Sequence, residues 1–172
     1  KKLLYIPLDG DEYLLVENRQ TDLNGDQSLY LDRDSTTNVI LGPGLSSDDP
    51  LDTTGDKEYD FLLPGQGILA WHIDPSVFCT VSSEVGGVGY ECGPNANPDF
   101  GINSNPERLG VAVVEADGIK DIGDPSSYYF YGSPFDPYFV GNHTVLGPDT
   151  NPSTKSNDGA YSHVMMEVQS PP

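Results

Sequence analysis

The stretch that decides the fold is Gly67-Ile68-Leu69-Ala70-Trp71-His72-Ile73-Asp74. It is short, apolar at most positions and preceded by the turn-forming pair Pro64-Gly65. Such a run predicts a strand that is buried on both faces. Glu12–Glu17 and Gly110–Ala116 have the same character. The sequence therefore predicts three buried strands at the centre of a sheet.

Weaker strand signals lie outside these three runs. Tyr161–Gln169 alternates between apolar and polar side chains, which predicts a half-exposed strand. Lys1–Leu8 is too short in its apolar part for a signal peptide and is better interpreted as a first strand. Asn38–Leu41 and Tyr128–Tyr131 are further candidates. No window shows the 3.6-residue periodicity and caps of a helix.

Long polar stretches separate the predicted strands, at about 21–37, 42–62, 75–108 and 132–160. The 172 residues include 19 glycines and 15 prolines, which marks a loop-rich protein. Loops of this length need bound ions, disulfides or a function to be ordered. We expect a single domain over residues 1–172, all-β or mostly β, with sandwich-like antiparallel sheets and long loops.

The charge is strongly negative, with 27 acidic residues against 8 basic ones and a formal net charge of −19. Nucleic acid and anionic membrane surfaces both require basic residues, so neither is an expected partner. No run of about 20 apolar residues is present to insert into a membrane. A compact body this acidic repels itself. Bound divalent cations would offset the repulsion, and an acidic solvated surface is the alternative.

Cys79 and Cys92 are the only cysteines. An even number in a loop-rich acidic chain favours a disulfide and an oxidising, extracellular compartment. Two free buried thiols are the alternative. The spacing fits no zinc-ligand knuckle.

Two oxygen-rich stretches are candidate calcium loops, because Ca²⁺ prefers carboxylate and carbonyl oxygens. In the first, Asp22, Asn24 and Asp26 alternate along the chain. It is not an EF-hand, since Gln27 and Arg33 stand where that motif requires Gly and Glu. An Asx-rich turn is the alternative.

The second stretch contains Asp117, Asp121 and Asp124, and the acidic loop Ser46–Asp56 is a weaker third candidate. Acids also follow the three apolar strands, at Glu17, at Asp74, and at Glu115 with Asp117. These acids either gather at one edge of the sheet or simply mark where each strand reaches water.

No complete catalytic site is recognisable. His72, His143 and His163 share no local zinc motif, and no His-Glu-x-x-His is present, so zinc is not expected in this chain. Glu17 and Glu115 would suit a glycoside hydrolase only if the fold placed their carboxylates within about 5–10 Å. Asn142-His143-Thr144 is a glycosylation sequon if the source is eukaryotic.

Three segments together resemble the immune inhibitor A family of secreted bacterial metalloproteases. Residues 12–20 (EYLLVENRQ) resemble its EYFLLENRQ segment, residues 63–74 (LPGQGILAWHID) its LPGxGLLIWHID, and residues 110–118 (GVAVVEADG) its GVDLEQADG. They occur in the family's order. Residues 152–154 (PST), with Asp158-Gly159, fit more loosely.

The resemblance implies that the chain is the C-terminal part of a peptidase unit, downstream of the zinc motif, and that it carries structural calcium. Asp74, Glu115 and Asp117 lie in the matched segments and are therefore candidate calcium ligands. We expect a secreted, non-catalytic, calcium-stabilised accessory region whose partner is the upstream catalytic domain of the same polypeptide. The alternatives are an extracellular module that binds a glycan or protein, and a stand-alone glycoside hydrolase.

Overall fold

The structure is a computed structural model, and it describes residues 2–23, 31–44, 60, 63–84, 87–96 and 101–170. Its elements in chain order are β1 (Leu3–Pro7), β2 (Tyr13–Arg19), β3 (Leu31–Arg33), β4 (Ile40–Pro43), β5 (Gly67–Ile73), the single 3₁₀ turn η1 (Pro75–Val77), β6 (Cys79–Glu84), β7 (Gly87–Cys92), β8 (Val111–Val113), β9 (Val145–Leu146) and β10 (Met166–Glu167). No α-helix occurs within these residues, and all strand pairs are antiparallel. The prediction of a mostly-β, antiparallel fold with long loops is confirmed.

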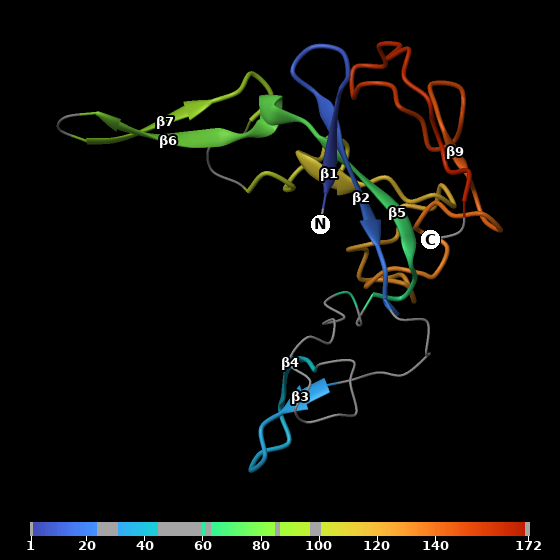
Figure 1. The fold of residues 1–172 in the computed structure, drawn as a ribbon. Coiled ribbons are helices and arrows are strands. Elements are labelled where there is room, and N and C mark those ends of the chain that lie inside the picture. The colour runs from blue at the N-terminus through green and yellow to red at the C-terminus, as the bar shows by residue number, and fades with distance from the viewer. Residues whose placement is uncertain are drawn as a thin grey trace.

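The main sheet has the strand order β1-β2-β5-β8, of which Figure 1 labels β1, β2 and β5. Strand β5 is its centre, and β2 pairs with it from Tyr13 opposite Ile73 to Arg19 opposite Gly67. On its other edge β5 has two partners. Strand β8 covers one half, and Tyr138 covers the other half through two backbone hydrogen bonds to Ile68, each of 2.9 Å. The two chain segments around residues 114 and 138 are thereby brought together.

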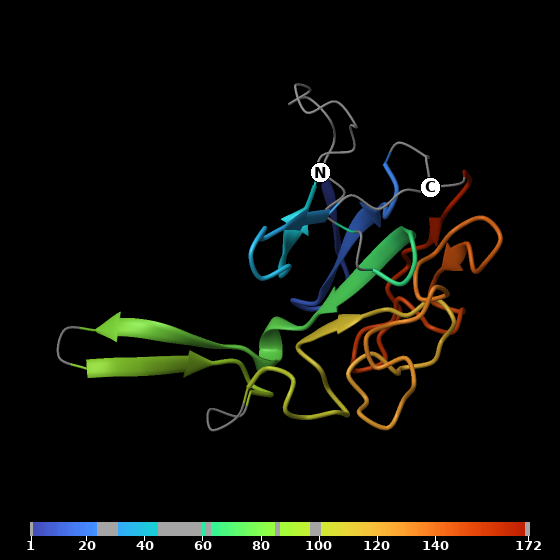
Figure 2. The same cartoon turned by 90° about the horizontal axis from the view of Figure 1, so that it is seen from below.

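One face of this sheet carries the core. Side chains from the sheet pack there against the C-terminal part of the chain, which includes β9 and β10 and covers this face (Figure 2). The buried core consists of Leu14, Val16, Ala70, Val114, Ala116, Tyr138 and Leu146. The layer that faces the sheet is therefore built mostly from loops, held by a few deeply buried apolar side chains.

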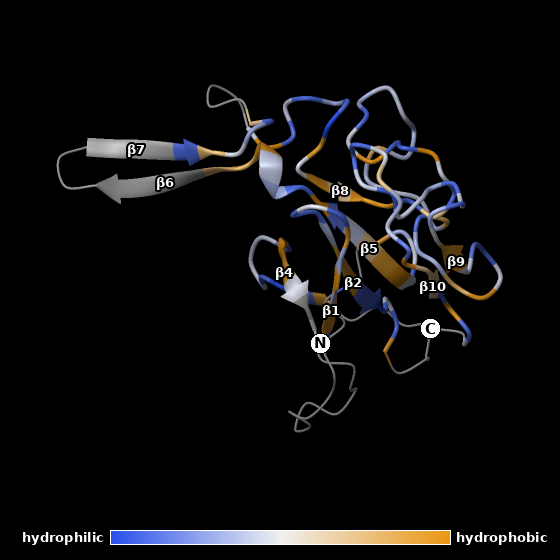
Figure 3. Ribbon diagram, turned by 90° about the horizontal axis from the view of Figure 1, so that it is seen from above, coloured by the Kyte–Doolittle hydropathy of each residue, from blue (hydrophilic) through white to orange (hydrophobic). Residues whose placement is uncertain are grey.

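The opposite face carries a row of apolar residues that runs across all four strands. The strand register aligns Tyr5 with Leu15, Leu15 with Trp71, and Trp71 with Val113. Strand β8 and much of β5 are hydrophobic in Figure 3. Tyr5 is 57% exposed, and Leu15, Trp71 and Val113 are half-buried. This row is therefore only partly covered by the described part of the chain.

The strongest strand predictions are confirmed. The run 67–74 forms β5, the run 12–17 forms β2, and the run 110–116 contains β8. Lys1–Leu8 contains β1. Each is anchored by pairing in the same sheet, which satisfies the backbone groups of a strand too apolar to remain in water.

Three weaker predictions need correction. Tyr128–Tyr131 is a turn, because backbone hydrogen bonds close it from Gly123 to Phe130 and from Gly132 to Tyr129. Only Met166–Glu167 of the run 161–169 is strand, since His163 has the left-handed φ of 57° that interrupts extended backbone. In the same way Asn38 (φ 58°) belongs to a turn, and the strand begins at Ile40.

The sequence did not predict the hairpin of β6 and β7, which extends away from the main sheet (Figures 1 and 2). Cys79 and Cys92 are directly opposite each other at its base and form a disulfide, so the predicted pairing is confirmed.

Replacing both cysteines by serine is expected to loosen this hairpin and leave the sheet intact. A crosslink around a loop of this size contributes about 3 kcal/mol in the chain-entropy model. Among the described strands β6 and β7 pair only with each other, so that contribution falls mainly on the hairpin. We expect proteolysis between residues 80 and 91 to be at least tenfold faster. Limited proteolysis read by mass spectrometry, with the reduced native protein as control, measures this. Unchanged cleavage, or a collapse of the thermal unfolding midpoint of the sheet, would contradict it.

Candidate metal centre

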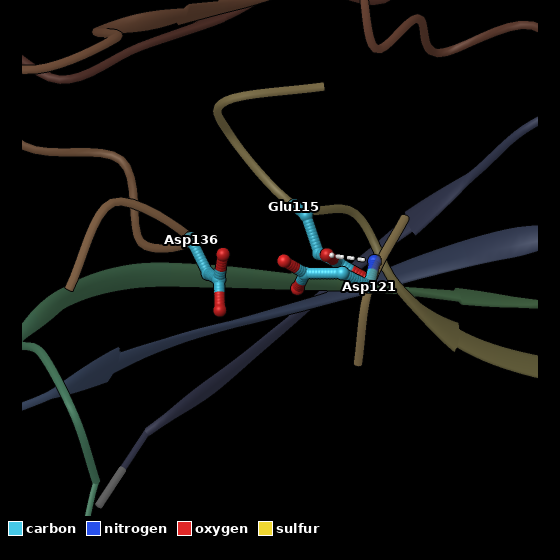
Figure 4. Close-up of side chains that lie close together, drawn as sticks. All are labelled: Glu115, Asp121 and Asp136. Carbon is cyan, nitrogen blue, oxygen red and sulfur yellow. Dashed lines mark hydrogen bonds between the residues drawn. The ribbon is translucent and has the colours of Figure 1, made fainter. Parts of the chain in front are cut away.

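Three buried carboxylates meet beside the main sheet. Glu115, Asp121 and Asp136 are 6%, 8% and 3% exposed. One oxygen of each lies within 4.8 Å of the others. In Figure 4 the three side chains point toward one another from the end of β8, from the turn that follows it, and from the loop before Tyr138.

The sheet explains how two of these residues meet. The Val114 N–H donates to the Ala70 carbonyl at 2.8 Å, and two residues later the Ala116 N–H donates to the Asp136 carbonyl at 2.8 Å. The chain thus leaves the edge of β5 at Glu115 and pairs with the loop that carries Asp136. Tyr138, bonded to Ile68, fixes that loop from the other side.

A tight turn adds Asp121. The Gly118 N–H donates to the Glu115 carbonyl, and Gly118 has a φ of 75°, which glycine adopts without strain. The Asp121 N–H then donates to Glu115 Oε2 at 2.9 Å, the bond drawn in Figure 4. The turn therefore folds the second oxygen-rich stretch back over the end of the strand.

The hydrogen bonds of the cluster leave one oxygen without a partner. Both oxygens of Asp136 accept from Ser133, and Asp121 Oδ2 accepts from the Ser127 hydroxyl at 3.2 Å. Asp121 Oδ1 is buried and has no hydrogen-bond donor within the described residues. A buried polar atom without a partner costs free energy unless a ligand satisfies it.

The electrostatics of the cluster are unfavourable for three negative charges. Burial, followed by repulsion from Asp136 and Asp121, raises the pKa of Glu115 from 4.5 to about 7. Burial, with repulsion from Asp117 and Asp121, also raises the pKa of Asp136. None of the ion pairs between described residues reaches these three carboxylates. The cluster could hold a metal ion, because a cation would offset the repulsion and satisfy Asp121 Oδ1.

The other predicted ligands of this stretch lie outside the cluster. Asp117 is half-buried, and its Oδ1 accepts the Ile119 N–H. Asp124 is exposed, and hydrogen bonds from the Ser126 hydroxyl and N–H lower its pKa. Both form local Asx turns. Burial and the charge of Asp117 raise the pKa of Tyr138, whose hydroxyl is buried and unpartnered among the described residues.

The first oxygen-rich stretch and the third acidic loop add no described residue to the centre. Asp22 is half-buried elsewhere in the chain, while Asn24, Asp26 and the loop Ser46–Asp56 lie outside the described residues. Asp136 was missed by the sequence reasoning, since no neighbouring oxygen-rich pattern distinguishes it. Only its backbone pairing with Ala116 brings it to the other two.

Asp74 belongs to a separate, cation-containing network. It caps η1 through hydrogen bonds to Ser76, and its Oδ2 accepts from Arg108 Nε and Asn157, each at 2.8 Å. Burial alone would raise its pKa, but the bonds from Ser76 and Asn157 and the charge of Arg108 lower it overall. Arg108 also contacts Glu12 at 3.4 Å. Asp74 is therefore fully engaged by protein partners.

The same network holds His72. Its Nε2 lies 2.7 Å from Glu12 Oε2, and that oxygen also accepts the Asn157 N–H. His72 lies two residues before Asp74 in the chain, and the network connects the two through Glu12, Arg108 and Asn157. His72 also lines a polar cavity of about 390 Å³ next to Lys155 and Asn157.

The acids that follow the strands do not gather at one edge. Because β2 and β5 are antiparallel, Glu17 lies opposite Leu69, near the start of β5, and Asp74 follows its end. Glu17 Oε1 accepts from Trp71 at 2.9 Å and from Arg19 at 2.6 Å. Glu17 therefore has its own partners, and Glu115 belongs to the carboxylate cluster.

Within the described residues, no helix is long and apolar enough to cross a membrane. Comparison of the chain with family models, with curated proteins and with solved structures gave no match.

Proposed function

We propose that the chain is a calcium-stabilised, non-catalytic accessory module of a secreted, metalloprotease-like protein. The observation that carries the cation assignment is the buried, unpartnered Asp121 Oδ1 within a cluster of three buried carboxylates. A bound cation gives that oxygen a partner and offsets the burial and the repulsion that together raise the pKa of Glu115 to about 7.

Calcium is favoured among the common cations by the chemistry of the donors. All three side chains offer hard oxygen ligands, and the cluster contains no histidine or cysteine. Two of the three ligands come from loops, and Ca²⁺ accepts the flexible geometry that loops provide. Mg²⁺ demands near-octahedral geometry and dehydrates reluctantly. The overall charge of −19 favours cation uptake further.

The accessory role is supported by where the three family-like segments lie. They correspond to β2, β5 and β8, which are adjacent in the main sheet. The third segment, residues 110–118, leads directly into the carboxylate cluster. The segments that carry the resemblance and the candidate ion site thus belong to one structural unit, as expected of a module that supports a neighbouring catalytic domain.

Replacing Asp121 by asparagine is expected to weaken calcium binding at least tenfold, because it removes the negative charge and one oxygen of the carboxylate whose Oδ1 is unpartnered among the described residues. Isothermal titration of the dialysed protein with CaCl₂ measures the affinity. Asp124→Asn is the matched control, since Asp124 is exposed in the same stretch and its carboxylate bonds only Ser126 among the described residues. Absence of calcium binding by the native chain, or equal losses in the two variants, would contradict the assignment.

A second candidate function is an extracellular binding module, and the exposed aromatic residues favour it. Tyr128 is 94% exposed and Tyr131 is 89% exposed, and the rings of Phe130 and Tyr131 pack edge to face at 4.8 Å. Exposed aromatic side chains stand out on a surface and commonly mark binding sites. A glycan array with the native protein and Tyr128→Ala distinguishes carbohydrate from protein as the partner class.

A further inference from the structure

A second cavity, of about 260 Å³, opens beside the carboxylate cluster on the less covered face of the main sheet. Its sheet side is formed by Leu69, Trp71 and Val113, and its loop side includes Pro64, Tyr131 and Pro137. Five of these six are hydrophobic or proline side chains, and the sixth is a tyrosine. An apolar cavity of roughly 150 Å³ is enough for a benzene ring. The cavity therefore has room for one aromatic side chain.

Besides Tyr131, the charged or hydroxyl side chains that line the cavity are Arg19, Ser133 and Asp136. Arg19 lines it, with its Nη1 bonded to Asp60 and its Nη2 bonded to Glu17, each at 2.6 Å. Its Nε is buried and has no acceptor within the described residues. Ser133 and Asp136 bond each other through two hydrogen bonds. A lining whose charged side chains are already engaged suits an apolar side chain and does not suit a sugar, which presents many hydroxyls.

The cavity continues into the apolar row on the same face of the sheet. Trp71 and Val113 belong to both, and the register extends the row through Leu15 to Tyr5. Tyr131, the most exposed of the lining side chains named above, stands at the border of the cavity. An extended segment can therefore place one side chain in the cavity and lie along partly exposed aromatic and aliphatic surface.

Charge selects the kind of segment. The protein carries a net charge of −19. Beside this cavity, the paired carboxylates of Glu17 and Asp60 and the buried carboxylate of Asp136 outnumber the one guanidinium of Arg19. A partner with basic residues is attracted and an acidic one is repelled. We propose that the cavity between β5 and the loop 131–137 binds an aromatic side chain of a basic polypeptide segment. This deepens the second candidate function and does not depend on the bound cation.

The test uses Trp71, the only tryptophan of the chain, as the reporter. Two peptides serve as probes, acetyl-Lys-Lys-Phe-Lys-Lys-amide and the same peptide with Ala in place of Phe, titrated at 150 mM salt. We expect the Phe peptide to change the Trp71 emission and to bind at least tenfold more tightly. The peptide with Glu in place of Lys is expected to bind more weakly than the Lys form. Equal affinities of the Phe and Ala peptides would overturn the proposal, because charge alone would then explain binding.

Two variants locate the binding. Val113→Phe fills the cavity and is expected to weaken the Phe peptide at least tenfold, whereas Val111→Phe makes the same change two residues away, outside the cavity lining. Tyr131→Ala removes an exposed side chain, so the protein is expected to remain folded. This variant is expected to weaken binding of the Phe peptide at least threefold. Equal effects of Val111→Phe and Val113→Phe would overturn the assignment. A dimer of the native protein would also overturn it, if sedimentation shows that Val113→Phe dissociates the dimer and Val111→Phe does not. The cavity would then hold a side chain of a second copy of this chain.

The two proposals fail separately. The Phe-over-Ala preference is measured once with calcium and once with a chelator. If calcium does not bind but the preference persists, the cavity assignment stands and the cation assignment is wrong. If calcium binds but the preference is absent, the cation assignment stands and the cavity assignment is wrong.

Discussion

Replacing Arg108 by leucine is expected to lower the free energy of unfolding by about 3–5 kcal/mol, the cost of leaving buried charges without a partner. Arg108 Nε donates to Asp74, and its Nη2 contacts Glu12. Those two acids are 1% and 6% exposed, so water cannot replace the lost cation. Domains of this kind are stable by only about 5–15 kcal/mol, which makes the loss a large fraction of the total. Urea unfolding followed by Trp71 fluorescence measures it.

The effect of this variant depends on pH with a definite sign. The pKa of Asp74 is lowered in the folded protein, so its ionised form contributes stability above its ordinary pKa and loses that contribution as the pH falls through the folded value. The difference in the free energy of unfolding between Arg108→Leu and the native protein is therefore expected to be largest at pH 7 and to decrease below about pH 4. A difference that stays constant down to pH 3 would show that Arg108 acts through packing alone.

Two control variants separate burial from charge. Asp158 bonds Arg108 at 2.6 Å but is 73% exposed, so Asp158→Asn is expected to change the free energy of unfolding far less than Arg108→Leu does. Arg33 is exposed on β3, and Arg33→Leu is expected to stay within about 0.5 kcal/mol of the native protein. A cost for either control equal to that of Arg108→Leu would refute the burial argument.

Calcium is expected to stabilise the protein by about 4 kcal/mol at pH 7.5 when it is present at a thousand times its dissociation constant. Near neutral pH the metal-free protein is expected to become less stable as the pH rises, which is the opposite direction to ordinary acid denaturation. Because the pKa of Glu115 rises from 4.5 to about 7 on folding, its contribution is fully present below pH 4.5 and is lost as the pH rises to 7. The loss is on the order of 3 kcal/mol.

Urea unfolding midpoints, measured between pH 5 and pH 8 with a chelator and again with saturating calcium, test how stability changes with pH in the metal-free and the calcium-bound protein. The metal-free midpoint is expected to fall across this range. The calcium-bound midpoint is expected not to fall, since the cation replaces the proton on Glu115. Glu115→Gln is the control, and it is expected to flatten the metal-free slope and to reduce the gain from calcium. Parallel slopes in the native protein would contradict the cation site, and a metal-free midpoint that does not fall would contradict the burial of Glu115.

The amino-acid sequence was sufficient for those features that depend on neighbours along the chain. Runs such as 12–17 and 67–74 are apolar on both faces, and only a paired, buried strand removes them from water. The two cysteines had only each other as partners. The oxygen-rich stretch after Glu115 could be recognised because an Asp-Gly turn of this kind folds back on itself, which brings Asp121 to Glu115.

Tertiary structure alone decided which of the many acids form a site. Asp136 joins the cluster because Ala116 and Tyr138 pair with neighbouring segments, a register that no local pattern of residues encodes. Asp74 equally resembled a ligand, but the fold gave it Arg108 from a distant loop. In a chain with 27 acidic residues, the sequence supplies the charges, and only packing determines which of them lose water and which gain a cationic partner.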